Sequence, residues 1–174
     1  MINTARLALR PFRGDDLPRV KAILGDPNVM AFSDDGALGH TACLEWLKRA
    51  KRTTPDRGLP LMLAICLKKD GRLIGYVSLA NEPHRVSDGE AEIGFRLAHN
   101  CWGRGIATEA AQAVVAHAQH LSGTKRIVAC VDPNNRHSLR VLQKIGMAYD
   151  RDVMFEGYDY PDQRFSLDLA AAAQ

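Results

Sequence analysis

The sequence predicts a mixed α/β (α+β) fold, in which a central sheet carries helices on both faces. Short segments of β-branched, aromatic or alternating apolar residues recur along the chain, and an Asp70-Gly71 turn joins two of them into a hairpin. A strand–helix–strand unit follows this hairpin, and such a unit needs a crossover between strands of one sheet. This order of elements favours one mixed sheet between helices.

The N-terminal part is expected to contain one strand and two helices. Leucines alternate with Ala8 and Arg10 over 7–10, which predicts a strand. Asp15 or Asp16 can cap a helix that ends at Gly25. A second helix is expected from about Thr41 to Arg52, with cations near its end.

The middle and the end of the chain are expected to contain most of the strands. Leu61 to Lys68 and Leu73 to Leu79 flank the Asp70-Gly71 turn, and Ala91 to Leu97 is a further strand. Met154 to Asp168 is expected to hold one or two final strands.

Two helices accompany the strand Arg126 to Val131. The first opens at 103–105 and has alanines and Val114 at helical spacing. The second runs from about Arg136 to Ile145 and is closed by Gly146.

Composition excludes several classes of protein. Lysines and arginines exceed carboxylates by 23 − 20 = 3 without forming a block, so no nucleic-acid partner is expected. The longest uncharged apolar stretch, 59–67, is far shorter than the roughly 20 residues of a membrane span, and the first six residues lack the apolar core expected of a signal peptide. The four cysteines lie far apart, which favours reduced thiols in the cytoplasm over a zinc site or disulfides.

The segment Trp102 to Ala110 is a candidate phosphate-binding loop. It leads from a strand into the start of a helix, where unpaired backbone N–H groups and the helix dipole attract anions. Gly103 and Gly105 allow close approach, and Arg104 adds a positive charge. A helix start that only needs a flexible entry explains the glycines equally well. The segment matches neither a Walker A loop nor a GxGxxG motif.

The segment Asp132 to Met147 contains a second candidate. Asn135 is a good N-cap, and Ser138 would then stand at position N3. The simpler alternative is that both residues only satisfy the end of the helix.

Taken together, these segments resemble the GNAT acetyltransferase superfamily and its RimJ/RimL-like branch over nearly the whole chain. The resemblance rests on Arg10-Pro11-Phe12, Asp70 to Tyr76, Ala91 to Phe95, Trp102 to Ala110, and Asn135 to Met147. Trp102 departs from the superfamily pattern, because Gln or Arg is more common at that position.

The resemblance implies a twisted, mostly antiparallel sheet of six to seven strands, with a splayed parallel pair formed by 91–97 and 126–131. It implies one domain over 1–169, with 170–174 as a disordered tail. Acetyl-CoA would be the co-substrate, with its pantetheine in the gap between the splayed strands and its pyrophosphate on the backbone of the loop. The residues expected to bind it are Phe95, Arg96, Leu97, Trp102, Gly103, Arg104, Gly105, Ile106, Ala107, Thr108, Asn135 and Ser138.

The chemistry of amine acylation defines which catalytic groups the site needs. An alkylamine is mostly protonated at neutral pH, so a base, an oxyanion donor and an acid for the leaving thiolate are needed. The resemblance implies that Ser138 is the acid, since it matches the family serine that faces the cofactor sulfur. It also makes Glu92 the first candidate for the base, since some relatives place a catalytic glutamate on this strand, although Glu92 is equally explained as a solvated or salt-bridged carboxylate. A backbone N–H near Phe95 or Leu97 would stabilise the oxyanion. Further candidates for the base are a water chain and Glu82, His84, Glu156 and Asp159.

The predicted function is N-acetylation of a primary amine, either a protein N-terminal α-amine or a small molecule. The alternative is a non-catalytic acyl-CoA sensor on the same fold. No metal is expected, since His117 and His120 lack further ligands. Carboxylates that could attract a cationic acceptor are Asp34, Asp35, Glu82, Asp88, Glu156, Asp159 and Asp162. A monomer and a homodimer are both compatible with the sequence.

Overall fold

The computed structural model describes residues 1–53, 59–81, 86–121 and 123–169. These residues form one eight-stranded sheet in the order β1-β2-β3-β4-β5-β6-β8-β7. Every neighbouring pair is antiparallel except β5 and β6, which are parallel. The strands are β1 (Ile2–Asn3), β2 (Leu7–Arg10), β3 (Leu61–Leu67), β4 (Leu73–Ala80), β5 (Glu90–Leu97), β6 (Arg126–Val131), β7 (Ala148–Val153) and β8 (Asp162–Asp168).

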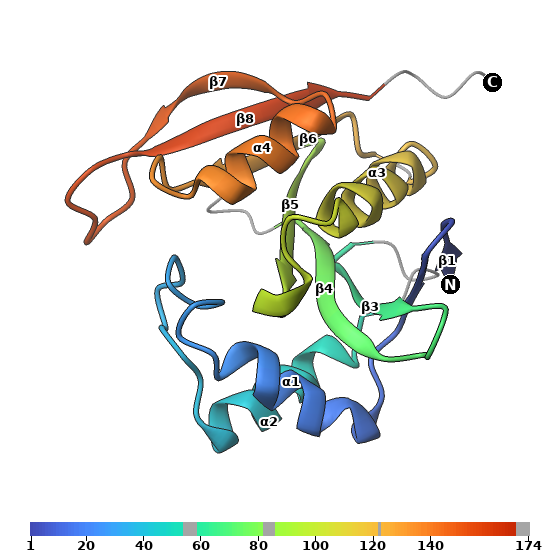
Figure 1. Cartoon of the computed structure of the whole chain (residues 1–174). Helices are drawn as coiled ribbons and strands as arrows, with labels where there is room; N and C mark the ends of the chain where they lie inside the picture. Colours follow the sequence, from blue (N-terminus) through green and yellow to red (C-terminus); the bar gives the residue numbers. More distant parts are fainter. Residues whose placement is uncertain (54–58, 82–85, 122, 170–174) are drawn as a thin grey trace.

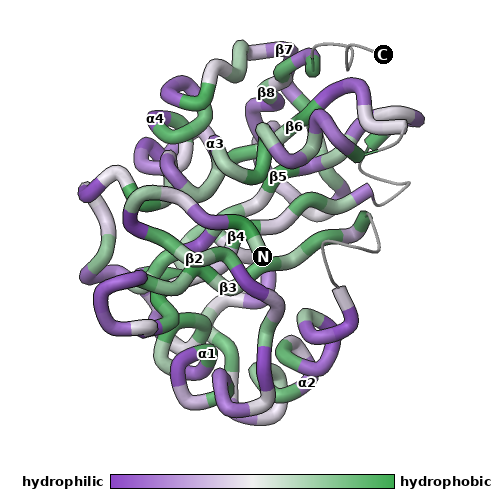
Figure 2. The backbone as a smooth tube through the Cα atoms, turned by 90° about the vertical axis from the view of Figure 1, so that its right-hand side faces the viewer, coloured by the Kyte–Doolittle hydropathy of each residue, from purple (hydrophilic) through white to green (hydrophobic). Residues whose placement is uncertain are grey.

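Helices cover both faces of the sheet, as the order of elements predicted (Figure 1). The helices α1 (Leu17–Leu24) and α2 (His40–Ala50) lie against one face, and α3 (Ile106–Ala118) and α4 (Arg136–Lys144) lie against the other. Hydrophobic segments gather along the central strands, whereas hydrophilic ones lie at the outer turns (Figure 2). The mixed α/β architecture is therefore confirmed.

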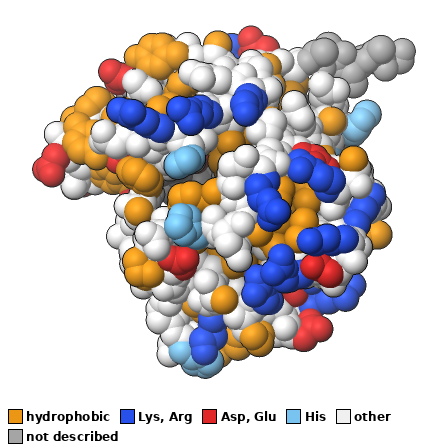
Figure 3. Space-filling model, in the orientation of Figure 1, with side chains coloured by type: hydrophobic (Ala, Val, Ile, Leu, Met, Phe, Trp, Pro, Cys, Tyr) orange, Lys and Arg blue, Asp and Glu red, His pale blue; other side chains and the backbone are white. Residues whose placement is uncertain are grey.

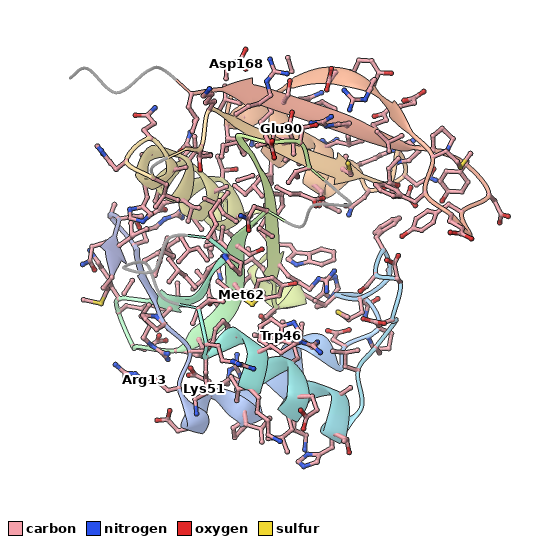
Figure 4. The ribbon with its side chains drawn as sticks, turned by 180° about the vertical axis from the view of Figure 1, so that it is seen from behind. Arg13, Trp46, Lys51, Met62, Glu90 and Asp168 are labelled. Atoms are coloured by element: carbon pink, nitrogen blue, oxygen red, sulfur yellow. The ribbon has the colours of Figure 1, made fainter. Side chains whose placement is uncertain are left out.

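Two apolar clusters hold the helices to the sheet. The cluster on the α3 and α4 side contains side chains such as Val77, Ile93 and Val114. The cluster on the α1 and α2 side includes Phe12 and Leu47, with Trp46 packed against it. From behind, Trp46 lies between α2 and the sheet, below Met62 (Figure 4). Because side chains alternate along a strand, the central strands β3 and β4 contribute to both clusters: Leu63 and Val77 belong to the first, and Ala64 and Leu73 belong to the second.

The prediction of six to seven strands was too low by at least one. The strand Ile2–Asn3 has only two residues, too few to show an alternating pattern. The penultimate strand is Ala148–Val153, upstream of the expected segment, and its first five residues are exposed. A strand with this little apolar burial carries no hydrophobic signal in the sequence.

The Asp16 carboxylate does not cap α1, although Asp16 stands at the N-cap position. It accepts two hydrogen bonds of 2.7 Å from the Arg10 guanidinium and one of 2.8 Å from the Arg13 backbone N–H. Burial alone would raise the pKa of Asp16, but these partners hold it below its ordinary value. The pair therefore ties the end of β2 to the start of α1.

Candidate functional site

The two parallel strands separate halfway along their length. Their paired residues are Glu90–Arg126, Ala91–Ile127 and Glu92–Val128, and the pairing ends there. The strand β5 continues to Leu97, still paired with β4, and β6 continues to Val131, paired with β8. A gap in the sheet therefore opens beyond Glu92, which confirms the predicted splayed pair.

Backbone groups of β5 point into this gap. The Ala98 N–H donates to the Ile74 carbonyl at 2.8 Å, so Ala98 and every second residue before it direct their backbone groups toward β4. Phe95 and Leu97 consequently face the gap. The Leu97 carbonyl accepts a hydrogen bond of 2.9 Å from the Trp102 indole, which leaves the Leu97 N–H and both polar groups of Phe95 directed at the opening.

Arg96 differs from its two neighbours. Its register partner in β4 is Tyr76, so its backbone groups are directed away from the gap. Its guanidinium reaches the Met30 sulfur at 3.0 Å, on the α1 and α2 face of the sheet. Of the three strand residues expected to bind pantetheine, the structure therefore directs only Phe95 and Leu97 at the gap.

The loop before α3 has the geometry of an anion cradle. Gly103 and Gly105 have φ angles of 71° and 72°, in the left-handed region that glycine adopts without strain. A Cβ atom added at Gly103 would have no described atom within 4 Å, so this backbone is open to approach. The N–H groups of the first turn (106–108) have no hydrogen-bond partner among the residues that the structure describes.

Side chains from the N-terminal segment and from α3 hold this loop in place. The Arg6 guanidinium donates to the Arg104 carbonyl at 2.9 Å and to the Glu109 carboxylate at 2.6 Å. Neither Arg6 nor Glu109 was singled out as a site residue from the sequence. Glu109 belongs to the Trp102–Ala110 motif, but nothing in the sequence connects it with Arg6.

The start of α4 lies next to the same loop. The Asn135 side chain accepts a hydrogen bond of 3.1 Å from the Ser138 backbone N–H and so caps the helix. The Ser138 hydroxyl has no hydrogen-bond partner in the described part of the chain. The Trp102 ring lies 5.3 Å from the His137 ring and 4.7 Å from the His99 ring. Trp102 therefore connects the loop with α4 and with the end of β5.

Lysine and arginine side chains form a row over α4 (Figure 3). The exposed cations of this helix, Arg136, Arg140 and Lys144, recur at intervals of four residues and so share one face. Arg104 is also exposed, in the loop before α3. The face that carries α3 and α4 is therefore locally basic, although the chain has a net charge of only +3.

Glu92 lies on the opposite face. Its neighbours Ala91 and Ile93 are buried on the α3 and α4 side, so alternation directs the half-buried Glu92 side chain toward the α1 and α2 side. Its pairing with Val128 is the last before the strands diverge. Glu92 therefore stands where the gap begins, on the face away from the loop.

A second carboxylate on this face, that of Glu90, is already hydrogen-bonded to an arginine. Glu90 accepts a hydrogen bond of 2.7 Å from the guanidinium of Arg164, a residue that is only 4% exposed. Burial alone would raise the pKa of Glu90, but hydrogen bonds from the Ser87 N–H and from Arg164 hold it below its ordinary value. Figure 4 shows Glu90 near the start of β5, beneath β8. This paired anion is a poor proton acceptor.

Two loops from distant parts of the chain meet beside the gap. Tyr158 belongs to the loop that connects β7 and β8, and Asp34 belongs to the loop that connects α1 and α2. The Tyr158 hydroxyl donates a hydrogen bond to the Asp34 carboxylate. The Tyr160 hydroxyl donates to Asp132 at 2.7 Å. The exposed Glu156 and Asp159 lie on the same β7–β8 loop, and the other two candidate bases, Glu82 and His84, lie outside the described residues.

Within the described ranges, no three His, Cys, Asp or Glu side chains lie close enough together to hold a metal ion. None of the helices there has the length and apolar content needed to cross a membrane.

The comparisons with known proteins agree with this geometry. The family described as "Acetyltransferase (GNAT) domain" matches residues 6–148. YkkB of Bacillus subtilis (strain 168) is 30% identical over 152 residues, which cover 86% of each chain. A GNAT-family acetyltransferase structure from Bacillus anthracis superimposes with a TM-score of 0.83 at 22% identity, covering 96% of this chain and 97% of that one.

A third similar protein has been solved with a ligand. The structure of RimL, a ribosomal L7/L12 alpha-N-protein acetyltransferase in complex with coenzyme A, superimposes with a TM-score of 0.80 at 20% identity and covers 97% of each chain. The splayed sheet and the glycine loop define an acyltransferase. The chain belongs to the GNAT acetyltransferase family.

Proposed function

We propose that the protein is an acetyl-CoA-dependent N-acetyltransferase of the RimJ/RimL-like branch that acetylates a primary amine. The observation that carries this proposal is that the gap in the sheet opens beside a helix start with an open, left-handed glycine backbone. The gap in the sheet suits an extended arm with amide groups, and the helix start suits phosphates. The proposed domain spans residues 1–169.

The residues present fit the donor. The pantetheine arm would pair with the backbone of Phe95 and Leu97, and the pyrophosphate would accept hydrogen bonds from N–H groups between Gly103 and Thr108. Among the described residues the 106–108 N–H groups have no other hydrogen-bond partner, which supports this assignment. The Asn135 amide group, whose oxygen already caps α4, keeps its two N–H donors for the pantetheine. Arg96 is assigned to the acceptor face instead.

The transfer needs no covalent enzyme intermediate. The amine nitrogen forms a bond with the acetyl carbonyl carbon, the C–S bond of the thioester breaks, and the amine loses one proton while the thiolate gains one. We assign the base to Glu92, or to a water chain in contact with it, because Glu92 stands at the start of the gap. Glu90 is not assigned to this role, since its pKa is lowered and Arg164 holds it.

Ser138 is assigned to the leaving thiolate. Its hydroxyl is not used in the cap, since the Asn135 side chain bonds the Ser138 backbone N–H instead. Both N–H groups face the gap, and the proposed oxyanion donor is the one of Phe95 or Leu97 that the pantetheine leaves unpaired. With the glycine loop and Glu92 on opposite faces, donor and acceptor would meet through the gap.

The acceptor is proposed to be a protein N-terminal α-amine or a small-molecule amine. Asp34 and Asp132, with the tyrosines that bond them, give the loops beside the gap an acidic and aromatic rim suited to a cationic amine. The free cysteines support a cytoplasmic location.

Calorimetry with acetyl-CoA and a thiol-release assay over a panel of amines and peptides test the proposal. Binding with amine-dependent release of coenzyme A is expected. No binding of acetyl-CoA or longer acyl-CoAs at millimolar concentration would refute it, and binding without thiol release would favour the acyl-CoA sensor. Glu92→Gln should lower kcat about 10²-fold or more. Glu156→Gln and Asp159→Asn test the two exposed carboxylates that are the alternative candidates for the base.

A further inference from the structure

The N-terminal segment of the chain reaches the phosphate-binding loop across the sheet edge. The Arg6 Nη1 donates to the Arg104 carbonyl at 2.9 Å, and Arg6 Nε donates to Glu109 Oε2 at 2.6 Å. Figure 1 shows β1, near the N-terminus, beside α3. Arg6 and Glu109 are 103 positions apart in the sequence, so only the folded chain brings them together.

The hydrogen bond to the Arg104 carbonyl orients a peptide plane of the loop. In a trans peptide the carbonyl and the following N–H point in opposite directions. Holding the Arg104 carbonyl on the Arg6 side therefore directs the Gly105 N–H to the other side. Because glycine flanks this peptide, rotation of the plane is otherwise easy, and a rotated plane would present a carbonyl oxygen to an anion.

Glu109 anchors Arg6 in the orientation that this requires. Its carboxylate accepts hydrogen bonds from the Arg6 backbone N–H at 2.9 Å, from Arg6 Nε, and from the Thr4 hydroxyl at 2.5 Å. The Glu109 side chain is 18% exposed, whereas that of Arg6 is 51% exposed. Burial alone would raise the pKa of Glu109, but the Thr4 and Arg6 hydrogen bonds hold it below its ordinary value. The carboxylate is therefore ionised, and Arg6 balances its charge.

We infer that Arg6 and Glu109 are positioning residues that orient the Arg104–Gly105 peptide so that the loop presents N–H groups to the pyrophosphate of coenzyme A. This inference rests on the proposed function of the loop. It assigns the segment before β2 a role in donor binding, without contact between that segment and the reacting atoms.

The two roles open to Glu109 predict opposite effects of Glu109→Gln. If Glu109 acted only through its charge, removing an anion beside the phosphate site would tighten coenzyme A binding. If Glu109 positions Arg6, weakening the anchor releases the peptide plane, and binding weakens. The sign of the change in affinity distinguishes these roles.

The experiment measures the Kd of coenzyme A by calorimetry and that of pantetheine by NMR titration, for the wild type, Glu109→Gln and Arg6→Met. We expect the Kd of coenzyme A to rise about tenfold in each variant, the loss expected for one charge-assisted hydrogen bond. The Kd of pantetheine, which lacks the pyrophosphate, should not change. The double variant should lose no more than either single variant, because the two residues act as one unit.

Arg6→Lys keeps the charge and can pair with Glu109, but a lysine lacks the planar fork that serves two acceptors at once. For Arg6→Lys we therefore expect a loss of coenzyme A affinity between those of the wild type and Arg6→Met. This variant replaces Arg6→Met in the experiment if Arg6→Met does not fold. The matched control is Arg126→Met, which removes an ion pair of 2.5 Å with Asp168 at the far end of β8 (Figure 4). Its coenzyme A affinity should equal that of the wild type.

Tighter or unchanged coenzyme A binding in Glu109→Gln overturns the inference, as does an equal loss for coenzyme A and pantetheine. A wild type that binds no coenzyme A at millimolar concentration overturns the proposed function and this inference together. A wild type that binds it, with variants that bind equally well, overturns the inference alone.

Discussion

The first turn of α4 allows helix capping to be separated from catalysis by two substitutions three residues apart. The Asn135 side chain accepts the hydrogen bond from the Ser138 backbone N–H, whereas the Ser138 hydroxyl bonds no described residue. Asn135→Ala therefore removes the cap, and Ser138→Ala leaves it in place. Only the second substitution removes the hydroxyl that is proposed to protonate the leaving thiolate.

The structure sets the expected magnitudes. Loss of an Asn cap costs about 1 kcal/mol, which lowers the Tm of a chain of this length by about 2–4 °C. Ser138→Ala should change the free energy of unfolding by less than about 0.5 kcal/mol, because the site is only partly buried and the hydroxyl bonds none of the described residues. Its kcat should fall about 10²-fold, the lower end for loss of a general acid, with the Kd of acetyl-CoA unchanged.

Urea unfolding, calorimetry with acetyl-CoA and initial rates of thiol release provide the three measurements. Asn135→Ala should lose stability and also acetyl-CoA affinity, since its amide group is assigned to the pantetheine. The reasoning is refuted if Ser138→Ala loses as much stability as Asn135→Ala, or if it keeps the wild-type kcat.

Three further predictions concern the loop, the sheet and the ion pair at the start of α1. Gly103→Ala should weaken acetyl-CoA binding in calorimetry, because its Cβ would enter the open side of the loop at a φ of 71°; wild-type affinity would contradict this. Gly75→Ala should cost about 3 kcal/mol in urea unfolding, since its Cβ would lie 2.1 Å from the Arg96 carbonyl oxygen. Asp16→Asn should cost about 3 kcal/mol at pH 7 by leaving Arg10 unpaired. The folded-state pKa of Asp16 is lowered, so the stability that its ionisation contributes is present above the ordinary value of 3.8 and is lost as pH falls through the lowered pKa. A stability difference between the wild type and Asp16→Asn that is equally large at pH 3 would contradict this.

Much of the fold could be predicted because its signals are local. The hairpin of β3 and β4 follows from two apolar runs around Asp70-Gly71, and α4 follows from an Asn cap and a closing Gly146. The strands β1 and β7 were missed or misplaced because neither buries enough apolar surface to produce a pattern. The motif residues of the loop were found in the sequence because glycine and helix-start chemistry act between near neighbours.

The sequence by itself determined most element types, the mixed sheet, the glycine loop before α3 and the cap of α4. Only the tertiary structure decided where β5 and β6 diverge and that Phe95 and Leu97 rather than Arg96 face the gap. It also decided that Arg6, anchored by Glu109, bonds the Arg104 carbonyl of the loop. The physical reason is the separation in sequence between the residues that interact. Helix periodicity, turns and caps depend on residues within a few positions of each other, whereas strand register and a contact across 103 residues depend on how the whole chain packs.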